Sequence, residues 1–186
     1  MALPLARCPD RSIRRPHSQQ KQPVADRAHY SVWSILASPL VIGTDLWTIE
    51  KEHPDCLALL KNPDIVKVNQ DPAALPPRLV EQTPPFGAPA ATTLNISSQT
   101  FARPLSAGRI AVLLLNRAPS PSSISVSWAK LGVPAGKTVA VYDVINNRAA
   151  GSATGSFAAT VPSHDVAFVI LAPAPGTPPL HHALSI

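Results

Sequence analysis

The fold is decided by residues 30–45, YSVWSILASPLVIGTD, together with the later stretch Asn69-Gln70-Asp71-Pro72. The first helix is predicted to be largely buried and to end at Pro39, because apolar side chains recur at helical spacing: Tyr30, Trp33, Leu36 and Ala37, with Val32 and Ile35 widening that face. The short run Leu40-Val41-Ile42 predicts a parallel strand buried on both faces, leading to Asp45. Helix, strand, carboxylate and second helix are typical of the end of a (β/α)8 barrel. Because a whole barrel needs roughly 250 residues, only its C-terminal part is expected here.

The charge of the chain is concentrated at its start. The formal net charge is +5, and residues 1–27 hold six basic and two acidic side chains, a net +4. We expect a disordered basic leader; a tail that binds nucleic acid or anionic lipid is the alternative. Neither a signal peptide in residues 1–27 nor a transmembrane helix is indicated, and localisation is left open. Cys8 and Cys56 form no metal or redox motif, and free thiols are favoured over a pair.

A different pattern begins after a proline-rich stretch. Residues 72–92 contain six prolines, which predicts a linker with a domain boundary near 75–80. From residue 78 onward apolar side chains alternate with polar ones, and turn signals recur at short intervals. This pattern predicts about seven antiparallel strands in a β-sandwich.

The clearest strand signals are at residues 110–115, 124–128, 139–143, 157–161 and 166–171. Turns are expected at 104–108, at Asn146-Asn147 and at 162–165, the last as a hairpin turn. Residues 173–186 are expected to form a disordered tail.

Four stretches carry a family resemblance. Residues 30–45 are similar to F-S-L-W-x-I-L-x-[AS]-P-L-[LI]-I-G-x-D, and residues 65–72, IVKVNQDP, resemble V-I-A-V-N-Q-D-P. Residues 101–117, FARPLSAGRIAVLLLNR, resemble W-x-R-P-L-S-x-G-x-x-A-V-x-x-x-N-R, and residues 161–164, VPSH, fit V-x-x-H. These patterns belong, in this order, to the α-galactosidases of the melibiase group, which are retaining glycoside hydrolases.

The resemblance implies a mainly β fold. A C-terminal antiparallel β-sandwich at 78–172 would follow a helix-strand-helix remnant of a (β/α)8 barrel at 28–75, between the leader 1–27 and the tail 173–186. The family cleaves terminal α-galactosyl groups, and some relatives prefer α-N-acetylgalactosamine or β-arabinopyranose. An α-galactoside or another carbohydrate is therefore the implied partner, without nucleic acid, membrane, metal or cofactor.

The catalytic residues of the family have no counterpart in this sequence. Retaining hydrolysis needs two carboxylates about 5–5.5 Å apart, which the family carries in a K-Y-D motif and in a segment before W-N-D-P-D-M. Neither is found here, so no catalytic residue is assigned. Two residues are substrate-pocket candidates. Asp10 lies in a weak counterpart of W-N-D-P-D-M, and Asp45 follows the predicted barrel strand; a tail residue and a helix cap are their respective alternatives.

Other residues have a structural and a functional interpretation. The pair His164-Asp165 suggests acid–base chemistry, but a turn hydrogen bond is favoured. Trp128 is expected in the sandwich core rather than as a sugar-stacking platform, while the exposure of Trp47 is left open. Asn95-Ile96-Ser97 is a possible glycosylation site in a secreted chain. His53, His181 and His182 lack metal-ligand spacing.

Three hypotheses follow. The preferred one is an α-galactosidase-like fragment that lacks its nucleophile and acid/base and is inactive alone. The second is a non-catalytic sandwich that binds carbohydrate or a partner chain. The third is a protein that binds nucleic acid through its basic leader.

Overall fold

The structure of the protein is a computed structural model. It describes residues 22–43, 45–85, 87, 95–174, 176 and 179–180. Asp10, Cys8 and most of the expected basic leader and C-terminal tail lie outside these residues.

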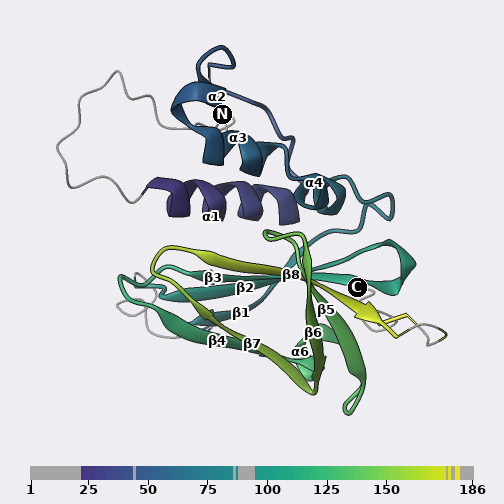
Figure 1. The fold of residues 1–186 in the computed structure, drawn as a ribbon. Coiled ribbons are helices and arrows are strands. Elements are labelled where there is room, and N and C mark those ends of the chain that lie inside the picture. The colour runs from purple at the N-terminus through teal and green to yellow at the C-terminus, as the bar shows by residue number, and fades with distance from the viewer. Residues whose placement is uncertain are drawn as a thin grey trace.

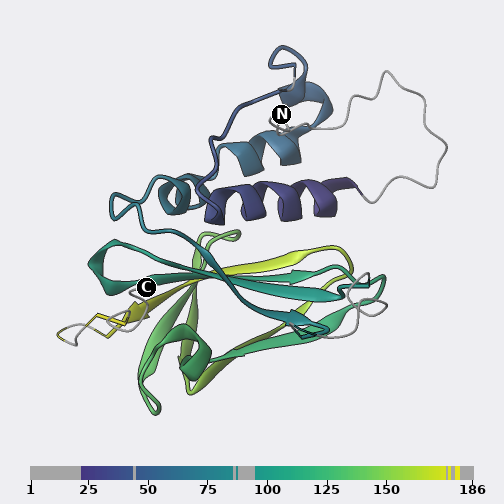
Figure 2. The same ribbon diagram turned by 180° about the vertical axis from the view of Figure 1, so that it is seen from behind.

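A layer of short helices covers one face of a β-sandwich (Figures 1 and 2). Helix α1 (Gln22–Ile35) lies directly on the larger of the two sheets. Helices α2 (Ile49–Glu52) and α3 (Pro54–Leu60) lie beyond α1, farther from the strands. Helix α4 (Pro63–Asn69) lies beside the C-terminal end of α1 and leads into the sandwich. We call the helices and their connections, residues 22–71, the helical layer.

The strands form two sheets, which confirms the predicted mainly β fold with a C-terminal antiparallel sandwich. The larger sheet has the order β1-β2-β3-β8-β5-β6 and the smaller one pairs β4 with β7, all antiparallel. The strands are β1 (Arg78–Thr83), β2 (Ser98–Pro104), β3 (Ile110–Asn116), β4 (Ser122–Ser127), β5 (Thr138–Asp143), β6 (Arg148–Thr154), β7 (Ser156–Val161) and β8 (Val166–Pro173). A 3₁₀ turn η2 (Ser106–Gly108) joins β2 to β3, and a short helix α6 (Trp128–Leu131) follows β4.

The predicted alternation builds the sandwich core. Ile124, Val126 and Trp128 are buried, while the serines between them face outward or lie at the margin. Strand β3 is buried along almost its whole length because it is covered by the small sheet on one side and by α1 on the other. The Trp128 indole Nε1 donates to the Lys137 carbonyl at 2.7 Å, so its one polar atom is satisfied inside the core.

The buried face of α1 differs from the predicted stripe. Of Tyr30, Trp33, Leu36 and Ala37, only Tyr30 is fully buried, and Leu36 is 40% exposed. Ile35, which was expected on this face, is fully buried, and the face is completed by Ser31 and Ser34. Small serine side chains let the helix approach the sheet closely, which the apolar periodicity did not reveal.

The predicted strand at Leu40-Val41-Ile42 does not form. Only an isolated bridge occurs at Ile42, and Val41 and Ile42 are 49% and 51% exposed. A parallel strand is stable only between neighbouring strands and covering helices. Among the described residues, none of the eight strands lies beside this segment.

The turn at 162–165 joins different sheets and is therefore not a hairpin. Strand β7 pairs with β4 in the small sheet, whereas β8 lies between β3 and β5 in the large one. The change of sheet is stabilised by Asn116, whose Nδ2 lies within 3.0 Å of the carbonyls of Ser120, Val161 and Pro162.

Three further expectations need correction. Helix α1 begins at Gln22, so residues 22–27, expected in the leader, are helical. In the expected tail, Leu180 is 1% exposed and its N–H donates to the Gly108 carbonyl, because the leucine side chain fills the sandwich core. The preference for a free thiol at Cys56 is wrong, since Cys56 is disulfide-bonded.

Candidate functional site

The resemblance motifs meet where the helical layer joins the sandwich. Asp71, from Asn69-Gln70-Asp71-Pro72, is 5% exposed and accepts hydrogen bonds from Ser106 N (2.7 Å) and Ser106 Oγ (2.8 Å). It also accepts from Ala73 N at 3.0 Å and from Arg109 Nη2 at 3.3 Å. Burial raises the pKa of Asp71, but these hydrogen bonds and the Arg109 charge together lower it below the usual value.

The backbone of η2 is shaped for this contact. Ala107 and Gly108 have φ of 56° and 68°, which closes the turn after Ser106. A Cβ at Gly108 would lie 2.5 Å from Pro179, so glycine is required both by the backbone angle and by close packing. The Asp71 carboxylate is therefore used to fasten η2 and is not free for catalysis.

Arg103 fastens the same junction from β2. Its side chain is 2% exposed and donates through Nη1 to the carbonyls of Val68 (2.6 Å) and Asn69 (3.1 Å), and through Nε to Leu75 (2.9 Å). These carbonyls belong to the C-terminal end of α4 and to the chain that follows it. A cation is favourable at a helix C-terminus. Arg103 thus caps α4 and fixes the direction in which the chain enters the sandwich.

The N-terminal end of α4 is held by a second contact. Asn62 caps the helix, since its Oδ1 accepts from Asp64 N and Ile65 N, while its Nδ2 donates to the carbonyls of Val144 and Ile145. The Tyr142 hydroxyl donates to Asp64 at 2.7 Å. The pKa of Asp64 is lowered, chiefly by the Tyr142 hydrogen bond; burial acts in the opposite direction, and Lys67 lowers the pKa further. Both ends of α4 are therefore fixed to the sandwich.

The third contact uses Asp165. Its carboxylate is 1% exposed and pairs with Arg27 of α1, with Arg27 Nε donating to Oδ1 at 2.8 Å. The hydrogen bond with Asp165 raises the pKa of Arg27, although burial acts in the opposite direction. His164 is exposed with φ of 57°. Asp165 thus makes a hydrogen bond within the turn, since its Oδ1 accepts from Val166 N at 2.8 Å. Its ionic partner is Arg27.

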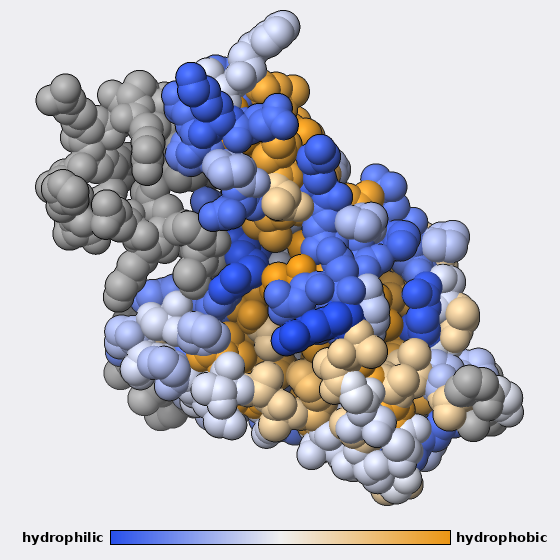
Figure 3. Space-filling view, in the orientation of Figure 1, coloured by the Kyte–Doolittle hydropathy of each residue, from blue (hydrophilic) through white to orange (hydrophobic). Residues whose placement is uncertain are grey.

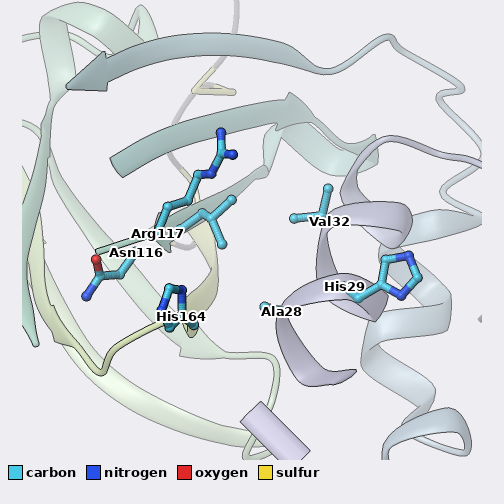
Figure 4. Close-up of a pocket in the computed structure, with 7 residues that line it drawn as sticks. Ala28, His29, Val32, Asn116, Arg117 and His164 are labelled. Atoms are coloured by element: carbon cyan, nitrogen blue, oxygen red, sulfur yellow. The ribbon is translucent and has the colours of Figure 1, made fainter. Parts of the chain in front are cut away.

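A shallow hollow opens beside this contact (Figure 4). It has a volume of about 380 Å³ and is lined by α1, the end of β3 and the turn before β8. The lining residues are Ala28, His29, Val32, Leu115, Asn116, Arg117 and His164. Figure 4 shows Val32 directed toward the hollow and His29 directed away from it. The described lining residues include no carboxylate, tyrosine or tryptophan, so the hollow offers neither the carboxylate pair of a retaining glycosidase nor the ring of a tyrosine or tryptophan on which a sugar can stack.

The outer side of the helical layer exposes large apolar side chains. Between α1 and α2, Val41, Ile42, Leu46 and Trp47 are 49%, 51%, 61% and 92% exposed, and Leu36 precedes them. We call these five residues the apolar connection. Figure 3 shows hydrophobic surface interspersed with polar groups over this layer. Large exposed apolar groups in one segment mark a surface that another polypeptide or ligand covers.

The remaining candidates are placed as follows. Asp10 lies outside the described residues. The Asp45 carboxylate is exposed and accepts from Trp47 N (2.9 Å) and Thr48 Oγ1 (3.0 Å), which is capping of the turn before α2. Asn95 is exposed in a turn just before β2. Trp128 is 1% exposed, so it is a core residue and not a sugar platform.

Sequence reasoning missed the partners of the motif residues. Asn69-Gln70-Asp71-Pro72 was recognised as a motif, but Ser106, Arg109 and Arg103 were not identified as the groups that bind it and the end of α4. They lie more than 30 residues away, and the only available signal was their shared membership of family motifs. No group of three or more metal-binding side chains is found in the described residues. None of the helices there is long and apolar enough to cross a membrane.

The comparisons with known proteins agree on one family. Residues 96–171 match the family described as the alpha galactosidase C-terminal beta sandwich domain. Alpha-galactosidase 3 of Arabidopsis thaliana is 32% identical over 148 residues, which cover 79% of this chain and 31% of that protein. This chain spans about a third of the length of such curated relatives.

Solved structures share the fold. Alpha-galactosidase I from Mortierella vinacea has a TM-score of 0.69 at 20% identity, covering 84% of this chain and 37% of that one. The Saccharomyces cerevisiae α-galactosidase with raffinose also gives 0.69, at 18% identity, covering 84% and 45% respectively. The match of the sandwich residues, the relatives and the order of the motifs together identify this chain as a C-terminal part of the melibiase-group α-galactosidase family.

Proposed function

We propose that this chain serves as the C-terminal part of an α-galactosidase-like retaining glycoside hydrolase and does not hydrolyse glycosides by itself. The proposal rests on how much of each chain takes part in the match with the relatives. The match includes 79% of this chain but only 31% of the Arabidopsis enzyme. The proposed substrate class, a terminal α-galactoside, comes from the names of these relatives.

The distribution of carboxylates supports the inactive state. Retaining hydrolysis needs two carboxyl groups on opposite sides of one glycosidic bond. The two most buried carboxylates described, Asp71 and Asp165, are each engaged by an arginine, at different contacts of the helical layer. The family's K-Y-D motif is absent from the 186 residues. The nucleophile and the acid/base therefore have to come from polypeptide other than these residues.

The apolar connection supports the same proposal. Its side chains lie on the helical layer, whereas the opposite side of α1 is packed on the sandwich. In the proposed enzyme this connection packs against the catalytic barrel, which would bury Ile42 and Leu46. The helices then complete the catalytic barrel on the side that faces the sandwich.

A chimera tests the proposal. Residues 22–180, which include Arg27 and Leu180 with their contacts, replace the corresponding C-terminal part of Arabidopsis alpha-galactosidase 3. Release of 4-nitrophenol from its α-galactoside is then measured. We expect turnover by the chimera and none by the 186-residue chain. Turnover by the chain alone would disprove the inactive state. A folded but inactive chimera would disprove the role as an enzyme part.

We also propose that Asp45 supports the substrate pocket from behind the residues that touch the sugar. Variants of the chimera distinguish this role from capping of the turn before α2. Asp45→Ala removes the carboxylate, whereas Thr48→Val removes only one hydrogen bond to it. A pocket role predicts a larger fall in kcat/KM for Asp45→Ala than for Thr48→Val. Equal effects would leave Asp45 as a cap alone. The same assay applies to Asp10→Ala if the chimera is extended to residue 1.

A further inference from the structure

The sequence contains one acceptor pattern for an N-linked glycan, Asn95-Ile96-Ser97. The pattern requires a hydroxyl residue two positions after the asparagine and no proline between them. The other five asparagines lack that hydroxyl residue; Asn62, for example, is followed by Pro63-Asp64. If the chain is glycosylated through an amide nitrogen in this way, only Asn95 can be the acceptor.

The structure places this asparagine where a glycan fits. Ser97 is held on both sides just before β2. Its N–H donates to the Thr83 carbonyl of β1 at 2.8 Å, and its carbonyl accepts from Arg117 N, just after β3, at 2.7 Å. Asn95 lies two residues beyond that contact, in a turn, and is exposed. The backbone is therefore fixed at Ser97, while the acceptor side chain is outside the sheet. A sugar chain there replaces no core or junction contact.

A second observation concerns the compartment. Cys56 is disulfide-bonded, and stable disulfides form in oxidising compartments such as the secretory lumen. N-linked transfer takes place in that same lumen. The disulfide and the acceptor pattern come from different parts of the molecule and indicate the same environment.

We propose that Asn95 carries an N-linked glycan. In the transfer, Asn95 Nδ2 bonds to the anomeric carbon of an oligosaccharide held on a polyprenyl pyrophosphate. The bond between that carbon and the pyrophosphate oxygen breaks, its electron pair leaves with the pyrophosphate, and Nδ2 loses one proton. No oxidant or reductant is needed. This assignment is independent of the proposed glycosidase role.

The test uses the full chain with a cleavable secretion leader placed before Met1, expressed in a eukaryotic secretory host. Peptide mapping by mass spectrometry is applied to all translocated chain, whether secreted or retained, so that occupancy does not depend on export. We expect the peptide containing Asn95 to carry a glycan that an endoglycosidase reduces to a single N-acetylhexosamine.

Four variants define the site. Asn95→Gln and Ser97→Ala are expected to abolish the modification, and Ser97→Thr to retain it, because threonine keeps the hydroxyl. Ser98→Ala, one residue further on, is the matched control and is expected to be glycosylated like the unchanged chain. An unmodified Asn95 in translocated wild-type chain would overturn the proposal, as would a glycan that persists in Asn95→Gln.

Discussion

The sandwich and the helical layer bury their apolar side chains in different ways. In the sandwich, Ile110, Val112, Leu114 and Trp128 are at most 1% exposed and are enclosed by strands on both sides. In the helical layer only one side is enclosed, and Trp47 on the other side is 92% exposed. The space between the two sheets is thus filled by the sandwich itself, whereas the helical layer packs on the large sheet with one side and exposes apolar side chains on the other.

The attachment of the helical layer is also different in kind. Its contact with the sandwich combines a small apolar cluster with buried polar ties through Asp71, Arg103, Asn62 and Asp165. Hydrogen bonds to charged groups depend strongly on both partners being present, because a buried group left alone loses its hydration without compensation. The helical layer should therefore respond to single polar substitutions and to acid, while the sandwich should respond mainly to loss of volume.

The largest contrast is expected between two tryptophans. Trp128→Ala removes a fully buried ring and the bond to Lys137, and should lower the free energy of unfolding by about 4 kcal/mol. Trp47→Ala is the matched control and should change it by less than about 0.5 kcal/mol. Denaturant unfolding of the full chain measures both. Similar losses of unfolding free energy for the two variants would contradict the distinction between the closed sandwich core and the exposed apolar connection.

A smaller effect is expected at the junction. Arg103→Ala leaves the carbonyls of Val68, Asn69 and Leu75 without their donor and should cost about 3 kcal/mol. Arg103→Lys restores the charge without the planar fork and should recover only part of this loss. Arg148→Ala, at an exposed position in β6, is the control. If Arg103→Ala matches this control in chemical unfolding, Arg103 does not hold the junction.

Acid should weaken the helical layer. The folded pKa of Asp71 lies below its usual value of 3.8, so its stabilising contribution is complete above that value and is lost as pH falls through the folded pKa. Asp64 acts in the same direction, while Asp26, whose pKa is raised by burial, acts in the opposite one. Asp71→Asn should lower stability near neutral pH and flatten its fall below about pH 4. An unchanged slope in unfolding at several pH values would exclude Asp71 as the acid-sensitive group.

The smallest change in unfolding free energy is expected for two serines of α1, and its sign should differ between them. The Ser31 hydroxyl is buried and finds no hydrogen-bond partner in the described part of the chain, whereas Ser34 Oγ donates to the Tyr30 carbonyl at 2.7 Å. Ser31→Ala should raise the free energy of unfolding by about 1 kcal/mol, since an uncompensated buried hydroxyl is removed. Ser34→Ala should lower it by a similar amount. Thermal unfolding of both variants gives the signs, and a destabilised Ser31→Ala would show a missing partner.

The sequence predicted the sandwich better than the helical layer for a physical reason. Alternation at Ile124, Val126 and Trp128 follows from local geometry, because successive residues of any strand face opposite sides. Leu40-Val41-Ile42 had equally strong apolar character, yet a parallel strand also needs neighbours, which a local pattern does not supply. Strand β6 was missed because its residues are small and weakly strand-forming; its register with β5 gives it its structure.

The candidate site was predictable only in part. The turn at 104–108 was predicted and forms η2, but its contact with Asp71 joins residues 35 positions apart, which no local pattern reveals. The pairing of Asp165 with Arg27 joins residues 138 positions apart, which no spacing rule reveals. Leu180 was missed because a proline-rich tail gives no sign of a single leucine returning to the core.

Amide hydrogen exchange on the full chain tests the central contrast most directly. The account predicts that amides of β3, residues 110–116, exchange at the rate of global unfolding. Those at 40–43 and 45–47 should exchange orders of magnitude faster, because this segment lies on the exposed side of the helical layer. Exchange of α4 should lie between these limits and become faster in Arg103→Ala. Equal protection of residues 40–42 and 110–115 would contradict the account.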